Sequence, residues 1–270
     1  MLKKALFAAS LFALATPAFA DTTLRVGASP VPHAEILEAA KPLLKEKGID
    51  LEVIVFQDYI LPNTTLAGKE IDANYFQHVP YLNSVLEQNK GDASYDFVNA
   101  GDIHVEPIGI YSKRVKSLAE LPQNGKVVMR DSVAEEGRIL SIFQRDGVVK
   151  LKEGVAPVDI RITDIVENPK NLEFLPNIEA SLLPQVFAND EADAVTINAN
   201  YALGAGLDPV KDPIALESAA NNPYANIITV RRGDEERAEI KTLVEVLQSD
   251  AIKTFINETY KGAVVPAEVK

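Results

Sequence analysis

The chain has 270 residues, a formal net charge of −12 and no cysteine. This acidic balance argues against nucleic acid and anionic membranes as partners, because both bind basic surfaces. Without cysteine the chain forms no disulfides and offers no cysteine for a lipid anchor. The length suits one large domain or two lobes of about 100 residues or more each.

Residues 1–20 have the features of a cleavable secretory signal peptide. Lys3 and Lys4 precede an apolar run, and Ala18-Phe19-Ala20 forms an A-x-A cleavage site. The run is too short to span a bilayer. We therefore expect cleavage after Ala20 with the loss of two lysines, which leaves a net charge near −14. The mature chain is then expected to be a soluble periplasmic protein that carries no lipid.

Strands and helices alternate through the first part of the mature chain. Three strands, at 23–28, 51–56 and 71–74, are separated by helical segments near 34–47 and 58–68. Strand–helix–strand order at this spacing predicts right-handed crossovers and a largely parallel sheet. Small molecules bind to such sheets beyond the carboxyl ends of the strands.

The second part of the chain repeats the pattern. An extended strand at 105–113 leaves the first unit, and a new sheet begins at Lys126. A helix follows Ser132, which has the capping-box spacing to Glu135. Residues 160–165 have the composition of another strand or strand fragment.

A strand at 226–231 is expected to return the chain to the first unit. The fold class is therefore α/β with two lobes and a cleft between them. We predict that residues 21–111 and 227–270 form lobe 1, and that residues 112–226 form lobe 2.

The segment Ile71–Tyr81 concentrates rings and amides at the end of the third strand. Aromatic faces beside a few directional polar groups are typical of small-molecule pockets. The alternative is that these rings belong to the core. Their place at a strand end, where Tyr59 also falls, favours the pocket.

Six stretches occur in one order along the chain: Pro32–Leu37, Asp58–Asn63, Asp72–Tyr81, Glu167–Leu172, Ile197–Ala202 and Pro223–Asn226. Together they resemble the MetQ/NlpA family of ABC-transporter substrate-binding proteins. The resemblance runs from about Leu24 to the tail at 261–264. It implies a type II-like periplasmic-binding-protein fold, in which two crossover strands join the lobes around a ligand cleft.

The resemblance also implies a function. The chain is expected to be a periplasmic substrate-binding protein of an ABC importer, a monomer with neither enzymatic activity nor a cofactor. Its expected ligand is a free amino acid, L-methionine, which it delivers to a membrane permease–ATPase complex.

Two features depart from the family pattern. Many members are lipoproteins with a cysteine at the mature start, where this chain has Asp21. The family usually has an Asn-Asp-Pro-Ser/Thr-Asn-like loop before Glu/Leu-Gly-Arg, whereas this chain has Arg130–Glu135 before Glu136-Gly137-Arg138. That loop lies near the charged end of the ligand in the family, so its change leaves the identity of the amino acid open.

An amino-acid ligand needs partners for its carboxylate and its ammonium. Arg138 is the best carboxylate partner, because its planar guanidinium can bind two oxygens and it lies near a helix N-terminus. The alternative is an i,i+3 pair with Glu135 on a solvated face. Asn198 and Asn226 can serve the polar end of the ligand through their amides, or they can cap loops. Asn200 competes with Asn198 for this role.

The side chain of the ligand needs an apolar wall. Tyr59, Tyr75, Phe76 and Tyr81 are candidates, because aromatic rings make favourable contacts with a thioether. Tyr75 and Phe76 are adjacent, so they cannot both face the cleft if the strand continues through them. His78 can hydrogen-bond the ligand or serve a structural role.

Other functions find weaker support. The chain has no G-x-S-x-G, H-E-x-x-H, P-loop or G-x-G-x-x-G motif, so nothing indicates an enzyme. A periplasmic metal-binding protein using His33, His78 and His104 is an alternative, but these histidines lack paired spacing and we expect no metal site. The same fold could also bind another amino acid, a methionine derivative or a short peptide.

Overall fold

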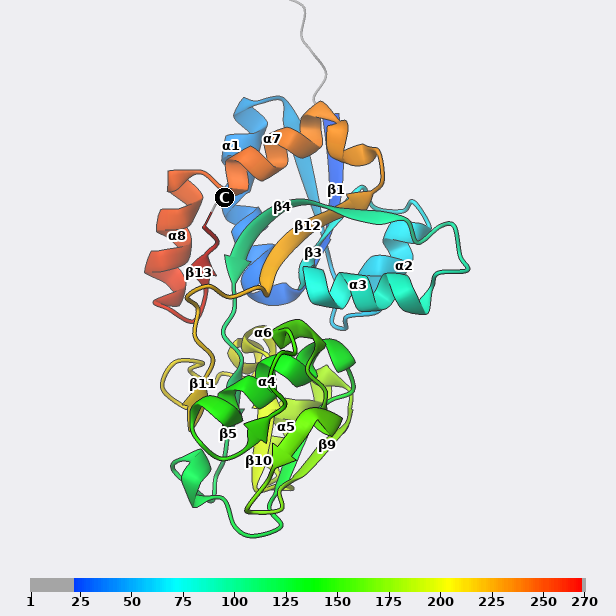
Figure 1. Cartoon of the computed structure of the whole chain (residues 1–270). Helices are drawn as coiled ribbons and strands as arrows, with labels where there is room; N and C mark the ends of the chain where they lie inside the picture. The colour runs from blue at the N-terminus through cyan, green and yellow to red at the C-terminus, as the bar shows by residue number, and fades with distance from the viewer. Residues whose placement is uncertain (1–21, 269–270) are drawn as a thin grey trace, which may run out of the picture.

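The computed structural model describes residues 22–268, which fold into two α/β lobes, one above the other in Figure 1. The predicted signal peptide and its cleavage site lie outside the described residues. The first four strands and the C-terminal helices form the upper lobe, and the middle of the chain forms the lower lobe. The chain therefore crosses between the lobes twice.

The upper lobe is built on a six-stranded sheet in the order β13-β4-β12-β3-β1-β2. β1 pairs in parallel with both β2 and β3, as the strand–helix–strand order predicts. β12 and β13 are antiparallel to their neighbours, because they enter the sheet after the chain has returned from the lower lobe. The strands are β1 (Thr22–Ala28), β2 (Ile49–Val55), β3 (Ala73–His78), β4 (Phe97–Val105), β12 (Ala225–Arg231) and β13 (Val265–Pro266).

Two groups of helices bury separate apolar clusters in the upper lobe. One cluster joins β1 and β12 to α1, α7 and α8, and the other joins Leu66 and Leu82 of α2 and α3 to Phe97 and Ile227. Each fully buried Leu or Ile contributes about 1.5–3 kcal/mol by leaving water. The helices are η1 (Pro30–Ala34), α1 (Glu35–Glu46), α2 (Leu61–Ala67), α3 (Val79–Gln88), η6 (Asp234–Glu236), α7 (Ala238–Leu247) and α8 (Asp250–Tyr260).

Amphipathic spacing explains why α1 lies where it does. Ile36, Leu37, Ala40 and Leu44 are all buried and share one face of the helix. The helix ends before Gly48, whose φ of 77° suits a left-handed residue after a helix terminus. The chain can therefore turn directly into β2.

The lower lobe contains a five-stranded sheet in the order β11-β5-β10-β6-β9. Its strands are β5 (Gly109–Tyr111), β6 (Lys126–Arg130), β9 (Glu173–Ile178), β10 (Ala194–Ile197) and β11 (Ala215–Leu216), and a small separate ladder pairs β7 (Lys150–Leu151) with β8 (Ile165–Glu167). The helices and helical turns are η2 (Leu118–Glu120), α4 (Val133–Arg145), η3 (Pro157–Asp159), η4 (Ile162–Asp164), η5 (Ala180–Leu182), α5 (Leu183–Ala188) and α6 (Ala199–Gly204).

Close packing holds α4 at the junction with the upper lobe. A Cβ added to Gly137 would lie 1.9 Å from the carbonyl oxygen of Pro157, so only glycine lets α4 approach η3 this closely. In Figure 1, α4 and α6 lie at the top of the lower lobe, facing α3 and the ends of β3 and β12. His78 at the end of β3 and Glu135 on α4 bond each other across this junction.

Four local predictions differ from the structure. β5 pairs with β10, so residues 109–111 belong to the second sheet and not to lobe 1. Pro107 separates β4 from β5, because it has no N–H to continue a ladder. Within residues 160–165, Ile162–Asp164 form the turn η4 and only Ile165 belongs to a strand. Ser132 makes no side-chain cap, because the Glu135 N–H donates to the Ser132 backbone carbonyl. The remaining lobe limits stay a prediction.

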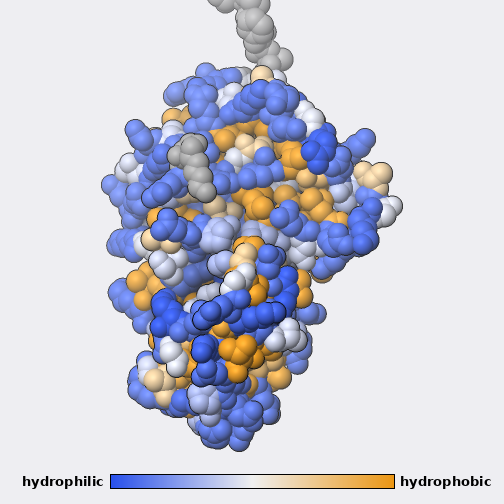
Figure 2. Space-filling view, in the orientation of Figure 1, coloured by the Kyte–Doolittle hydropathy of each residue, from blue (hydrophilic) through white to orange (hydrophobic). Residues whose placement is uncertain are grey.

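The outer surface is largely hydrophilic in the view of Figure 2, with apolar side chains in separate patches. Among residues 22–268, no helix has the length and apolar character needed to cross a membrane.

Candidate functional site

A small polar cavity lies where the two lobes meet. Its volume is about 30 Å³, close to that of one water molecule. Both lobes supply its walls: His33, Tyr59, Phe76, Gln77, His78, Tyr81 and Asn226 come from the upper lobe, Glu106 from the first crossing, and Arg130, Glu135, Arg138, Asn198, Ala199 and Asn200 from the lower lobe.

Strand ends and helix starts place most of these side chains. His78 ends β3 and also caps α3, since its Nδ1 accepts the backbone N–H of Tyr81 at 3.1 Å. This bond leaves the N–H on Nε2, which donates to Glu135 Oε1 across the cleft at 3.0 Å. Asn198 follows β10 directly, as expected for a ligand site beyond strand ends.

Glu135 is the centre of a buried charge cluster on the lower lobe. Its oxygens lie 3.5 Å from Arg130 Nη1 and 3.4 Å from Arg138 Nη1, in addition to the bond from His78. Burial alone would raise the pKa of Glu135, but Arg138, His78 and Arg130 together hold it well below its usual value. Glu135 is therefore ionised at neutral pH.

Arg138 also has partners outside the cavity. Its Nε donates to Glu217 Oε1 at 3.1 Å, its Nη2 bonds the other oxygen of Glu217, and Nη2 donates to the carbonyl of Glu106 at 3.0 Å. The sequence allowed a solvent-exposed ion pair between Arg138 and Glu135. In the structure this pair is buried and belongs to a larger network. Arg138 is held rigidly, with its guanidinium carbon 4.4 Å from the centre of the Tyr224 ring.

Aromatic rings form one wall of the cavity. Tyr59, Phe76 and Tyr81 pack together with ring centres about 6 Å apart. The guanidinium of Arg130 lies 4.7 Å from the Tyr59 ring and 4.8 Å from the Tyr81 ring, as cation–π contacts require. The Tyr59 hydroxyl donates to Asn200 Oδ1 at 2.6 Å and so bonds one lobe to the other.

Other residues that line the cavity present hydrogen-bond acceptors. Asn198 Oδ1 is buried and has no hydrogen-bond partner among the described residues. Glu106 is also buried, and burial raises the pKa of its carboxyl group even though His33 and Arg138 act against this. An unpaired buried acceptor costs about 1–3 kcal/mol, so its presence in a cavity indicates a place for a donor.

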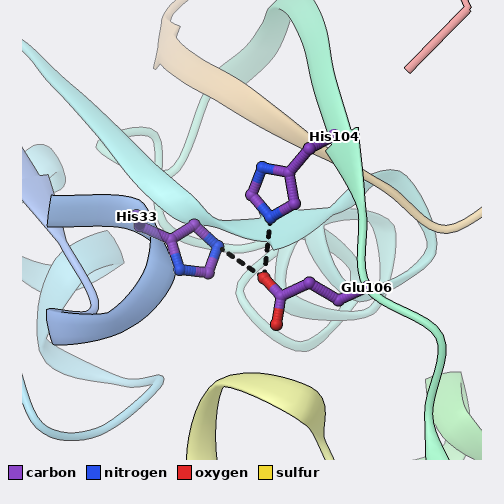
Figure 3. Close-up of side chains that lie close together, drawn as sticks. All are labelled: His33, His104 and Glu106. Atoms are coloured by element: carbon purple, nitrogen blue, oxygen red, sulfur yellow. Dashed lines mark hydrogen bonds and ion pairs between the residues drawn. The ribbon is translucent and has the colours of Figure 1, made fainter. Parts of the chain in front are cut away.

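Two histidines hold Glu106 in place (Figure 3). His33 Nε2 lies 3.2 Å and His104 Nε2 lies 2.7 Å from the same oxygen, Glu106 Oε1. His33 Nε2 also lies 2.9 Å from Asn226 Oδ1, and His104 Nδ1 bonds the Tyr75 hydroxyl. Burial lowers the pKa of His33 to about 4 and that of His104 to about 3, so both rings are neutral at neutral pH.

All but one of the predicted site residues line the cavity: Tyr59, Phe76, His78, Tyr81, Arg138, Asn198 and Asn226. Tyr75 does not, because strand alternation turns it into the upper core, where it is fully buried and bonds His104. Asn200 lines the cavity together with Asn198. Of the three histidines proposed as a metal set, His33 and His104 come together, while His78 pairs with Glu135.

The sequence-based prediction omits Glu106, Arg130, Glu135, His33 and Gln77 from the site. The position of Glu106 in the sequence could have indicated a site residue, because it directly follows the strand β4 and precedes Pro107 at the crossing between the lobes. Glu135 has the spacing of a helix cap, and Arg130 stands out only as a departure from the family loop. Their ion pairing depends on tertiary contacts.

Two α/β lobes that enclose a polar, closed cavity at their junction define a substrate-binding protein of the bilobal periplasmic type. The family model described as NlpA lipoprotein matches residues 24–268. The chain belongs to this family.

Curated relatives and solved structures agree with this assignment. The methionine-binding lipoprotein MetQ of Bacillus subtilis is 51% identical over 241 residues, which cover 89% of this chain and 86% of the relative. The D-methionine-binding lipoprotein MetQ of Escherichia coli is 37% identical over 90% of this chain and 87% of its own length. A nutrient-binding protein from Burkholderia cenocepacia, solved with bound methionine, is 41% identical, has a TM-score of 0.82 and aligns over 91% of this chain and all of its own.

These relatives correct the predicted location. Both MetQ proteins are named lipoproteins, which are membrane-anchored, so the expectation of a soluble protein without lipidation is wrong. That expectation relies on the absence of one residue type, and such an absence does not decide whether a protein is held at a membrane.

Proposed function

We propose that the chain binds methionine in the cavity between its lobes and delivers it to a membrane permease–ATPase complex as part of an ABC importer. The observation that carries this proposal is the unpaired Asn198 Oδ1, which lies with Glu106 in a cavity that also contains two arginines. A free amino acid carries both an ammonium and a carboxylate, and this cavity offers partners for both.

The acceptors suit the ammonium group. Glu106 supplies a negative charge, and the side-chain oxygens of Asn198 and Asn226 supply neutral acceptors. Hydrogen bonds to charged groups contribute about 1.5–3 kcal/mol, more than bonds between neutral groups. An amine is therefore the ligand group that this wall recognises best.

The cations suit the carboxylate group. Arg138 and Arg130 are both buried, and both line the cavity from the lower lobe. Nε and Nη2 of Arg138 already bind Glu217 and Glu106, so its Nη1 is the donor that remains for a ligand oxygen, and Arg130 can supply a second donor. Arg138 is already rigid through Glu217, so it needs little ordering when a ligand binds.

The rings suit a flexible thioether. Tyr59, Phe76 and Tyr81 form an apolar wall, and sulfur–aromatic contacts contribute about 0.3–1.5 kcal/mol each. The relatives named for methionine, and the methionine-bound structure, support this choice among amino acids. Arg130 stands between two of these rings, so another amino acid with an acceptor in its side chain is the second candidate.

Ligand entry requires the lobes to separate. The cavity of about 30 Å³ is far smaller than the roughly 300–1,000 Å³ of usual ligand pockets. Contacts between the lobes, such as Tyr59 with Asn200 and His78 with Glu135, close it. Hinge closure around a ligand is the usual motion of this class.

The test begins with native mass spectrometry of gently purified protein, which identifies any retained ligand by mass. Calorimetry on unfolded, dialysed and refolded protein then compares L-methionine, D-methionine and N-acetyl-methionine. We expect binding of methionine and loss of binding for the acetylated form, which has no ammonium. Binding of the acetylated form as tightly as methionine would exclude the ammonium site, and binding only of a different amino acid would change the ligand but keep the class.

A further inference from the structure

We propose that His33, His104 and Glu106 form a binding site for one divalent transition-metal ion of the Zn²⁺ type, and that this ion and the ammonium of the amino acid exclude each other. The second half rests on the proposed function. The site stands at the wall of the cavity, where His33 and Glu106 both line it. Figure 3 shows the two imidazoles and the carboxylate pointing toward one another.

The donor atoms have the right chemistry. Two imidazole nitrogens with one carboxylate oxygen are a ligand set for Zn²⁺ and its first-row neighbours. All three side chains are buried, at 1%, 0% and 7% exposure, so water does not compete for them. Both imidazoles direct Nε2 at the same Glu106 oxygen, so an ion bound there takes the place of the two Nε2 protons, and each ring keeps its proton on Nδ1.

The donor atoms also have the right spacing. The three lie within 4.8 Å of one another, and Glu106 Oε1 is 3.2 Å from one nitrogen and 2.7 Å from the other. With metal bonds of about 2.1 Å, such separations correspond to angles of roughly 80–100° at the ion. The two histidine nitrogens must lie no more than about 4.2 Å apart to share one ion, so ion binding draws the donor set, which spans up to 4.8 Å, slightly closer together.

The surroundings support ligation. Metal-bound histidines usually bond a second partner through the other ring nitrogen, and His104 Nδ1 bonds the Tyr75 hydroxyl in this way. Asn226 Oδ1, 2.9 Å from His33 Nε2, is a candidate for a fourth donor atom. The fully buried Tyr75, which does not line the cavity, thereby gains a role as an orienting residue.

Exclusion follows from charge. Glu106 is the carboxylate of this wall, whereas Glu135 is neutralised by Arg130, Arg138 and His78. A divalent ion and an ammonium would both need the Glu106 charge, and they repel each other at such short range. Linkage makes the effect reciprocal, so methionine weakens metal binding by the same factor as metal weakens methionine binding.

The first experiment titrates Zn²⁺ into ligand-free protein that has been treated with a chelator and dialysed. We expect one ion per chain. His104→Gln should weaken binding at least about tenfold, and Tyr75→Phe by about tenfold through loss of the orienting bond. Glu245→Gln, at an exposed carboxylate, is the matched control and should change nothing. No binding, or binding that His104→Gln leaves unchanged, overturns the site.

A second measurement needs no variant. The chain has three histidines, so nitrogen-15 NMR of the imidazoles resolves each candidate ligand. Zinc should shift the ring nitrogens of His33 and His104 and leave those of His78 in place, because His78 bonds Glu135 instead. A shift confined to His78, or no shift, contradicts the proposal even if a variant fails to fold.

The third experiment repeats the zinc titration with saturating methionine. Weaker zinc binding by about tenfold or more supports exclusion, since couplings between sites typically amount to about 5–150-fold. Unchanged zinc affinity overturns the exclusion. If methionine does not bind at all, the proposed function fails, while the titration without methionine still decides the metal site.

Discussion

Glu106 and Glu135 line the same cavity and are both buried, yet their pKa values shift in opposite directions. Glu106 faces two neutral histidines, and burial raises its pKa. Glu135 faces two arginines and His78, and their combined effect outweighs burial and lowers its pKa. The partners, and not the burial, decide the sign. Glu106, Asn198 and Asn226 thus offer acceptor groups to a cation, and Arg130 and Arg138 offer donor groups to an anion.

Removal of Arg138 should have the largest effect on methionine binding. Arg138→Ala leaves Glu135 and Glu217 with fewer partners and removes a carboxylate anchor, a loss of about 3–5 kcal/mol for a buried charged pair. This corresponds to methionine affinity weaker by roughly two to three orders of magnitude. Arg138→Lys should restore only part of it, because one ammonium group cannot replace the guanidinium donors that hold Glu217 and Glu135 as well as a ligand.

Calorimetry on stripped protein measures this loss, with Arg232→Ala as the control, because the side chain of that arginine is 60% exposed and does not line the cavity. Undiminished methionine binding by Arg138→Ala would show that the carboxylate is held elsewhere, with Arg130 as the next candidate.

Removal of the Glu106 charge should have the next largest effect on methionine binding. Glu106→Gln keeps the shape but removes the negative charge, so it should weaken methionine binding by about 1.5–3 kcal/mol, or roughly 10–150-fold. Its folding stability should stay equal or rise, because burial already disfavours the ionised carboxylate. Calorimetry and urea unfolding measure the two effects separately. Equal affinity in Glu106→Gln and wild type would place the ammonium away from this wall.

The pH dependence of folding stability should reveal the hydrogen bond between His78 and Glu135, which joins the two lobes. Burial lowers the pKa of His78 below its ordinary 6.5, although the bond to Glu135 opposes the shift. Below 6.5 the unfolded chain therefore binds the proton first, so stability falls as the pH drops from 6.5 toward the folded pKa, by at most about 1.4 kcal/mol per pH unit.

Urea unfolding between about pH 7 and pH 5 tests this, and His78→Gln should reduce the slope. It should not abolish the slope, because the lowered pKa values of His33 and His104 act in the same direction. An identical slope in His78→Gln and wild type would mean that His78 titrates normally.

The smallest effect should come from a neutral bond between the lobes. Tyr59→Phe removes the donor to Asn200 but keeps the ring that packs on Phe76. A net loss of about 0.5–1.5 kcal/mol corresponds to methionine binding weaker by roughly 2–10-fold, mainly through faster dissociation from a less stable closed form. Stopped-flow dissociation rates test it, with Tyr95→Phe, in the upper lobe away from the cavity, as the control. A larger loss than this would show that the hydroxyl also contacts the ligand.

Local patterns along the chain determined much of this protein. Alternation of apolar runs and turns predicted the α/β lobes, and the predicted helical segment near 34–47 corresponds to α1. The strand-end rule placed Phe76, His78 and Asn198 at the cavity. Such features need only neighbours along the chain, so periodicity and turn chemistry record them.

The tertiary structure alone decided which charges meet. The pairing of β12 with β4 sets Asn226 beside His104, with Glu106 following β4, and η1 adds His33 from a distant segment. Glu135 has the spacing of a helix cap, but the closing of the lobes gives it His78 and two arginines as partners. A charge and its pKa depend on what surrounds the group in space, and pairs separated by more than fifty residues leave no periodic trace in a single sequence.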